Sequence, residues 1–102
     1  MQHFLIRLNG PRPSFPADMS EEEGRFMQAH RVYWDGLTAA RTAILFGPVL
    51  DPSGAWGLAV VEVADESAAR GIVDADPVIQ AKIGFSYAVF PMRIGAIRGE
   101  AA

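Results

Sequence analysis

The sequence contains no cysteine. This absence excludes disulfide bonds, thiolate metal sites and cysteine nucleophiles. Histidine is scarce as well, because only His3 and His30 are present, far apart and without the HxH or HxxxH spacing of zinc ligands. No glycine-rich phosphate loop and no GxSxG nucleophile motif occurs. We therefore expect neither a metal site nor a bound cofactor.

Basic residues and long apolar runs are also in short supply. Lysine occurs once, at Lys82, the formal net charge is −3 and the arginines are scattered, which argues against a nucleic-acid partner. No apolar segment is long enough to span a membrane, and the one at the N-terminus is too short for a signal peptide. These features predict a cytoplasmic protein that binds neither nucleic acids nor membranes.

The hydrophobic residues, half of the 102 positions, suffice for one domain with a real core. We expect this domain at residues 1–95 and a flexible tail at residues 96–102. Apolar patterning predicts four strands, at residues 3–9, 42–49, 55–64 and 85–94. Helical spacing predicts helices at residues 20–37 and 66–75, with a further turn that begins at Pro77 and is capped at its end by Gly84.

The order strand, helix, strand, strand, helix, strand is that of the split βαβ, or ferredoxin-like, arrangement. The predicted fold class is α+β, with a four-stranded antiparallel sheet and both helices on one face. The third and fourth strands carry apolar residues on both faces, so the uncovered face needs a partner. A second copy of the chain is the economical partner, and we expect a homodimer with the two sheets packed face to face.

Residues 10–19 contain three prolines and a glycine and are predicted to form a loop. The loop is longer than most connections in compact domains, and loops of this kind often cover something.

The helix at residues 20–37 places a histidine on its apolar face. Ser20 and Glu23 have the spacing of a capping box at its start. His30 then shares one helical face with Phe26, Tyr33 and Leu37, so it points to the core or to a pocket. There it would serve as a general base near neutral pH, or as a core histidine satisfied by a carbonyl or a carboxylate.

Asp76 lies on the apolar face of the second predicted helix and immediately precedes Pro77. An aspartate in this position is an ordinary N-cap for the turn that follows. Its functional interpretation is to orient His30 and to stabilise the imidazolium. Both roles are compatible only if one carboxylate oxygen is left free for the imidazole.

The remaining candidates are weaker. Arg7, Arg12 and Arg41 would suit an anionic substrate, with Arg7 the best placed, but scattered arginines are more often solvated or in surface ion pairs. The aromatic residues favour core or dimer contacts over a cofactor cage; they are Trp34, Phe46, Trp56 and Phe85. His3 is expected to be exposed.

With these elements in place, the chain resembles the YciI-like (YCII-related) family of the dimeric α+β barrel group. The resemblance covers nearly the whole chain and rests on a combination of segments in the right order. These are HRVYWDGL (residues 30–37), LFGPVLDPSGAWGLAVVEV (45–63), ESAARGIVDADPVIQAKI (66–83) and YAVFPMR (87–93). Each segment alone is a weak signal.

The resemblance implies a small, cytoplasmic, dimeric, enzyme-like protein whose histidine and aspartate, here His30 and Asp76, form an active-site pair. Most members have no known reaction. One related enzyme removes chloride from a chlorinated hydroxyquinone, and muconolactone isomerases share the barrel. The loop at residues 10–19 is longer than in many members, so the resemblance does not indicate the pocket size or the substrate class of this chain.

The first hypothesis is therefore a lyase, isomerase or dehydrohalogenase that needs no cofactor and acts on a small cyclic or aromatic metabolite. His30 would abstract a proton, Asp76 would orient it, and the substrate contacts would be Arg7, Tyr33, Trp34, Phe46 and Gly47. The competing hypothesis is a non-catalytic dimeric module that binds a small ligand or a protein, with a structural His30. A heme-degrading monooxygenase of the same barrel group is a third option.

Overall fold

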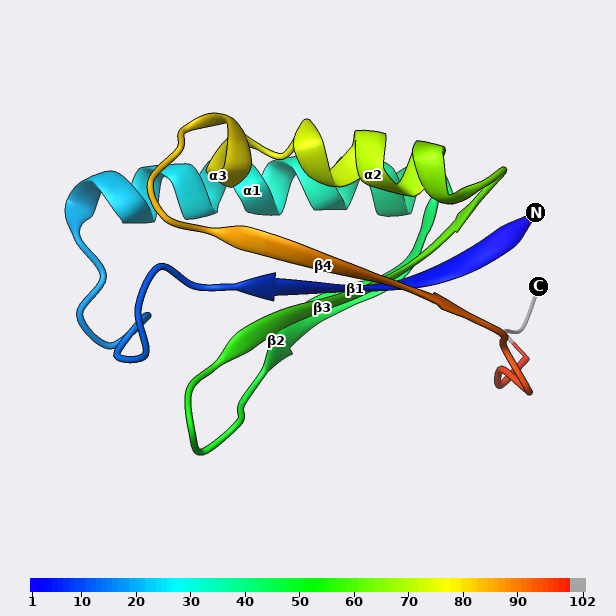
Figure 1. Ribbon diagram of the computed structural model, residues 1–102, viewed down its shortest axis with the longest axis horizontal. Helices are drawn as coiled ribbons and strands as arrows, with labels where there is room; N and C mark the ends of the chain where they lie inside the picture. Colours follow the sequence, from blue (N-terminus) through cyan, green and yellow to red (C-terminus); the bar gives the residue numbers. More distant parts are fainter. Residues whose placement is uncertain (100–102) are drawn as a thin grey trace.

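A computed structural model of the chain describes residues 1–99 (Figure 1). The elements in chain order are β1 (Gln2–Asn9), α1 (Glu21–Ala39), β2 (Ala43–Val49), β3 (Trp56–Val63), α2 (Glu66–Asp74), α3 (Pro77–Gln80) and β4 (Ser86–Met92). Within residues 1–99, no helix combines the length and the apolar character needed to cross a membrane.

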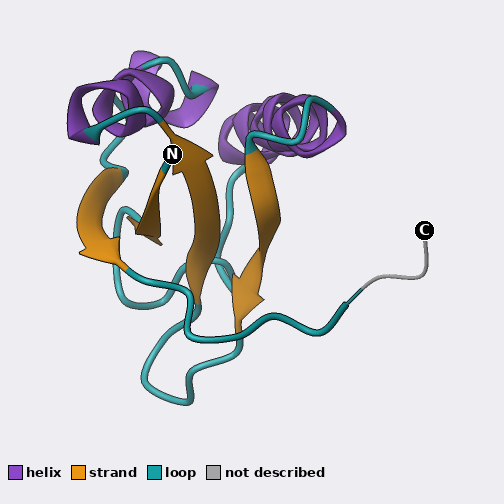
Figure 2. Ribbon diagram, turned by 90° about the vertical axis from the view of Figure 1, so that its right-hand side faces the viewer, coloured by secondary structure: helices purple, strands orange, loops and turns teal. Residues whose placement is uncertain are grey.

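The four strands form one antiparallel sheet in the order β2-β3-β1-β4. The helices lie together on one face of this sheet (Figure 2), which confirms the predicted α+β, ferredoxin-like class. β2 is an edge strand, as expected of a strand that contains Pro48, because proline cannot donate to a ladder hydrogen bond. β1 lies inside the sheet and pairs with β3 on one side and β4 on the other.

The core lies between the sheet and the helices. Strand alternation turns one face of β1 and β3 inward, and α1 and α2 complete the cluster; its buried members are Phe4, Ile6, Trp34, Ala43, Ala59, Val61, Val63, Ala69 and Val73. Trp34 is 1% exposed and is the largest of them. Trp34 is therefore at the centre of the buried face of α1, and Tyr33 and Leu37 pack at the margin of this face.

α1 ends at Ala39, just after Leu37 as expected, and Gly36 does not interrupt it. Two local expectations differ from the structure. Gly84 is not the cap of α3, which ends at Gln80 with Ala81 as C-cap. His3 is only partly exposed, because its Nε2 lies 2.9 Å from Glu62 Oε2 across the sheet.

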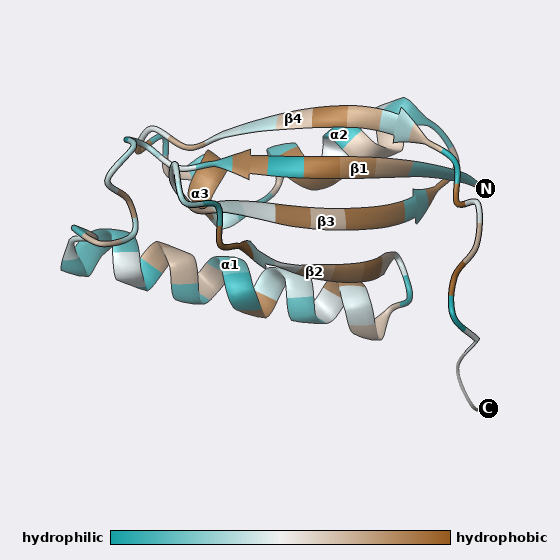
Figure 3. Ribbon diagram, turned by 90° about the horizontal axis from the view of Figure 1, so that it is seen from below, coloured by the Kyte–Doolittle hydropathy of each residue, from teal (hydrophilic) through white to brown (hydrophobic). Residues whose placement is uncertain are grey.

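The sheet face away from the helices is open. Figure 3 looks onto this face: hydrophobic residues predominate in the middle of β1, β3 and β4, and they alternate between the two faces of the sheet. Leu45 and Phe90 are each 49% exposed. The homodimer expected from this face stays a prediction.

The flexible tail at residues 96–102 also stays a prediction. Residues 96–99 lie outside any helix or strand, and residues 100–102 lie outside the described part of the chain.

Candidate functional site

Asp76 sits in the short connection between α2 and α3 and is 0% exposed. Its Oδ1 accepts a hydrogen bond from the Val78 backbone N–H at 3.0 Å, so it is the N-cap of α3. Pro77 follows at the first helical position, where its missing N–H costs nothing. The capping role thus uses one carboxylate oxygen and leaves Oδ2 for other donors.

Oδ2 of Asp76 accepts three hydrogen bonds from side chains of α1 and β4. His30 Nδ1 lies 2.7 Å away, Trp34 Nε1 2.8 Å and the Tyr87 hydroxyl 2.5 Å. Trp34 Nε1 also lies 3.2 Å from the Tyr87 hydroxyl oxygen. The carboxylate therefore receives four donors in all, and these replace the water that burial removes.

The charge state of this cluster follows from its hydrogen bonds. Burial alone would raise the pKa of Asp76, but the hydrogen bonds from His30 and Tyr87 hold that pKa below its usual value. Burial and the hydrogen bond to Asp76 raise the pKa of the Tyr87 hydroxyl far above its usual range, so the phenol keeps its proton and donates. An ionised Asp76 can only accept hydrogen bonds, so His30 Nδ1 must carry a proton. In the neutral ring, Nε2 is then the unprotonated nitrogen that can accept a proton.

His30 lines a cavity of about 310 Å³ between α1, the inner face of the sheet and the loop at residues 10–19. The side chain of His30 is 15% exposed. The cavity is at the lower end of the size range of small-molecule sites, about 300–1,000 Å³. Its other walls are mostly apolar; they include Ile6, Leu8, Phe15, Met19, Met27, Trp34, Phe46 and Phe85. The arrangement brings a histidine into contact with a mostly apolar cavity.

The structure brings together most of the candidate site residues. Trp34, Phe46 and Gly47 line the cavity with His30, and Asp76 lies directly behind the imidazole. The lining does not include Arg7 or Tyr33.

Both residues point elsewhere for simple geometric reasons. Arg7 alternates with the buried Ile6 and Leu8, so it lies on the open sheet face, where its guanidinium carbon is 4.3 Å from the centre of the Trp56 ring. Tyr33 faces α2 instead, and its hydroxyl donates to the Ile72 carbonyl at 2.6 Å.

Tyr87 is the site residue that the sequence did not identify. Alternation along β4 correctly places it on the inner face with Val89. Its contact with Asp76, however, depends on how α3 packs over the end of the sheet, which local patterning does not reveal.

The two tyrosines allow a matched test of the Asp76 cluster. Tyr87→Phe removes a hydrogen bond to a buried carboxylate, so we expect it to lower the free energy of unfolding by about 1.5–3 kcal/mol. Tyr33→Phe removes a bond to a neutral carbonyl and should cost about 0.5–1.5 kcal/mol. Urea unfolding of both variants at pH 7 makes the comparison, and equal losses would contradict the charged state assigned to Asp76.

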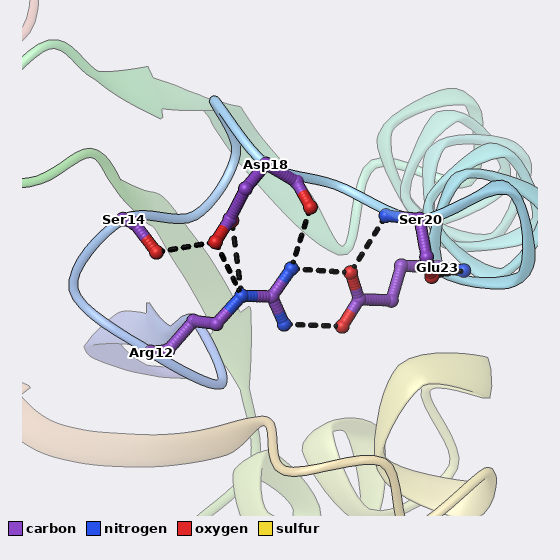
Figure 4. Close-up of polar contacts among 5 residues, drawn as sticks. All are labelled: Arg12, Ser14, Asp18, Ser20 and Glu23. Atoms are coloured by element: carbon purple, nitrogen blue, oxygen red, sulfur yellow. Dashed lines mark hydrogen bonds and ion pairs between the residues drawn. The ribbon is translucent and has the colours of Figure 1, made fainter.

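Arg12 organises a second polar cluster where the loop meets α1 (Figure 4). Its guanidinium makes a two-pronged ion pair with Glu23, with both N–O distances 2.7 Å, and its Nε lies 2.9 Å from both Asp18 carboxylate oxygens. Glu23 Oε1 also accepts the Ser20 backbone N–H at 2.9 Å, as the capping box requires. Arg12 is thus engaged by the protein's own carboxylates.

This cluster predicts a pH-dependent stability. The hydrogen bond from Arg12, with that from the Ser20 backbone, lowers the pKa of Glu23 from 4.5 to about 2. A carboxyl with a lowered folded-state pKa stabilises the fold above its unfolded value, and this stabilisation is lost as the pH falls from 4.5 to about 2.

We therefore expect Arg12→Gln to be less stable than wild type at pH 7, with the difference shrinking toward pH 2. Urea unfolding at a series of pH values measures the difference, with the exposed Arg25→Gln on α1 as the control. If the stability difference between wild type and Arg12→Gln stayed constant with pH, the ionisation of Glu23 would not be coupled to Arg12.

The comparisons with known proteins agree with this fold. A family model described as a YCII-related domain matches residues 3–93. A comparison with curated proteins finds no significant match. Within residues 1–99, no three histidine, cysteine, aspartate or glutamate side chains gather as a metal ion would require.

Proposed function

Because the chain belongs to the YCII-related domain family, we propose that it is an enzyme of the lyase, isomerase or dehydrohalogenase type. Its substrate is a small cyclic or aromatic molecule, and it uses no cofactor. One observation carries the proposal: an imidazole that is hydrogen-bonded at 2.7 Å to a buried carboxylate also lines an apolar cavity. A basic nitrogen held in this way is suited to proton transfer.

His30 Nε2 takes a proton from a carbon next to a carbonyl, or from a phenolic hydroxyl, of the bound molecule. The resulting imidazolium keeps its Nδ1–H bond to Asp76, whose negative charge stabilises it. The proton then returns to another atom of the ring in an isomerase, or is given up to solvent as a leaving group departs. Trp34 and Tyr87 fix the carboxylate that positions the base.

The apolar walls support this chemistry in a second way. They surround the ligand with side chains of low polarity, so a charge that develops on the ring is screened less and responds more strongly to the imidazolium. Phe46 is partly exposed and offers an aromatic surface to a flat ligand, and its ring centre lies 6.3 Å from that of the buried Trp34.

We further propose that the protein works as a cytoplasmic homodimer, with the open sheet faces of two copies in contact. The exposed side chains of Leu45 and Phe90 support this arrangement.

The competing proposal, a non-catalytic binding module, has less support. A purely structural histidine would be sealed in the core, whether bonded to a carbonyl or to a carboxylate. His30 is bonded to a carboxylate but also lines the cavity.

4-Nitrophenol tests the proposed base directly, because only its phenolate is yellow. At a pH where the free compound is mostly protonated, we expect the wild-type protein to increase phenolate absorbance by taking up the phenolic proton at His30. His30→Gln should bind the compound without this increase, since an amide is not a base. Binding without ionisation in the wild type would favour the binding module, and no binding would contradict the site.

A further inference from the structure

The loop at residues 10–19 forms part of the cavity wall. Phe15, Pro16 and Met19 all line the cavity, and Phe15 is only 8% exposed. The Phe15 ring meets the Phe85 ring edge to face, with ring centres 5.2 Å apart. Phe85 lines the same cavity immediately before β4. The two rings therefore form one section of the cavity wall together, and one of them belongs to the loop.

At three glycines, a side chain would crowd residues of the loop. A Cβ on Gly10 would come within 3.0 Å of the Phe15 ring, and one on Gly84 within 2.9 Å of Pro11 Cβ. A Cβ on Gly54, in the turn between β2 and β3, would lie 3.3 Å from the Pro13 carbonyl oxygen. Gly54 and Gly84 also have positive φ angles, of 135° and 103°, which other residues rarely adopt. The β2–β3 turn and the segment before β4 thus leave room for the loop.

Arg12 fixes the turn that carries Phe15. The Phe15 backbone N–H donates to the Arg12 carbonyl at 3.1 Å, and the Arg12 guanidinium carbon lies 5.8 Å from the centre of the Phe15 ring. The same guanidinium binds Glu23 on α1 (Figure 4). The position of the Phe15 ring is therefore tied to the helix that carries His30.

We propose that Phe15 determines ligand size: its ring is an end wall that limits the cavity to single-ring molecules, and Arg12 is the positioning residue that holds this wall. The inference rests on the proposed function only in taking the cavity as the ligand site. Shortening Phe15 should lengthen the cavity toward the loop without changing the hydrogen bond between His30 and Asp76.

The test compares phenol with 4-phenylphenol, which carry the same hydroxyl on one and two rings. Calorimetric titration of each compound into wild type, Phe15→Leu and Phe15→Ala gives the ratio of the two affinities. We expect Phe15→Ala to shift this ratio toward 4-phenylphenol by at least about tenfold, since pocket length discriminates ligands on this scale. Phe15→Leu should give an intermediate shift and covers the case in which the alanine variant does not fold.

Arg12→Gln should shift the ratio in the same direction but less, because it releases the wall without removing it. Val32→Ala, on the exposed side of α1, is the matched control and should leave the ratio unchanged. Folded variants that bind phenol normally but keep the wild-type ratio would overturn the end wall and leave the proposed function standing. Failure of every variant, wild type included, to bind either compound would overturn both.

Discussion

Asp76→Asn is expected to lower the free energy of unfolding by about 3–5 kcal/mol, a large share of the stability of a domain of this size. The carboxylate is fully buried, and its Oδ2 accepts three donors from His30, Trp34 and Tyr87. Asparagine has one acceptor oxygen, and its amide nitrogen would face donors. Either the α3 cap or the Trp34 and Tyr87 hydrogen bonds would be left unsatisfied inside the core.

Urea unfolding at pH 7, followed by tryptophan fluorescence, measures this loss. Asp74→Asn is the matched control, because Asp74 lies two residues earlier and is exposed. We expect that change to stay within about 0.5 kcal/mol of wild type. An Asp76→Asn variant as stable as the control would contradict the buried, fourfold-bonded carboxylate.

His30→Gln has the largest expected effect on activity. Loss of a general base typically lowers the rate by about 10² to 10⁴-fold, and glutamine cannot replace the proton acceptor. Glutamine is still able to donate a hydrogen bond toward Asp76, so we expect the variant to unfold at a higher urea concentration than Asp76→Asn. The activity measurement is kcat/KM for the first ring compound that the wild-type protein converts.

Tyr33→Phe is the control for this prediction, because Tyr33 is on the same helix but is bonded to Ile72 instead of lining the cavity. Its kcat/KM should remain close to the wild-type value. A His30→Gln variant that retains most of the wild-type rate would rule out the imidazole as the base and leave His30 with a structural role.

The sequence predicts the fold well because the signals of the fold are local. The alternation of Phe4, Ile6 and Leu8 defines the inner face of β1, and the capping box of Ser20 and Glu23 defines the start of α1. The element order then determines the ferredoxin-like class, and each strand lies within two residues of its expected bounds.

The candidate site is predicted only in part because its contacts are long-range. Helical spacing turns His30 inward, and the Asp76-Pro77 pair indicates a capped turn, but neither shows that Tyr87 meets the same carboxylate oxygen. Arg7 was a candidate for binding an anion, but it alternates with Ile6 along β1, and a period of two therefore places it on the sheet face opposite the helices.

The loop was recognised as a loop, but its conformation was not predicted. Its anchors are Glu23 on α1, Phe85 before β4 and Gly54 in the β2–β3 turn, which lie far apart in the sequence. Proline content alone indicates restricted conformations without saying which segments the loop contacts.

The tautomer of His30 shows whether its basic nitrogen is free to take a proton from a ligand. A long-range ¹H–¹⁵N correlation spectrum of the imidazole, recorded at a pH where the ring is neutral, identifies the nitrogen that carries the proton. We expect the Nδ1-protonated form in the wild type, because Nδ1 donates to the Asp76 carboxylate, and a loss of this preference in Asp76→Asn. A wild-type ring protonated at Nε2 would rule out His30 as the base, because Nε2 would then have no free lone pair.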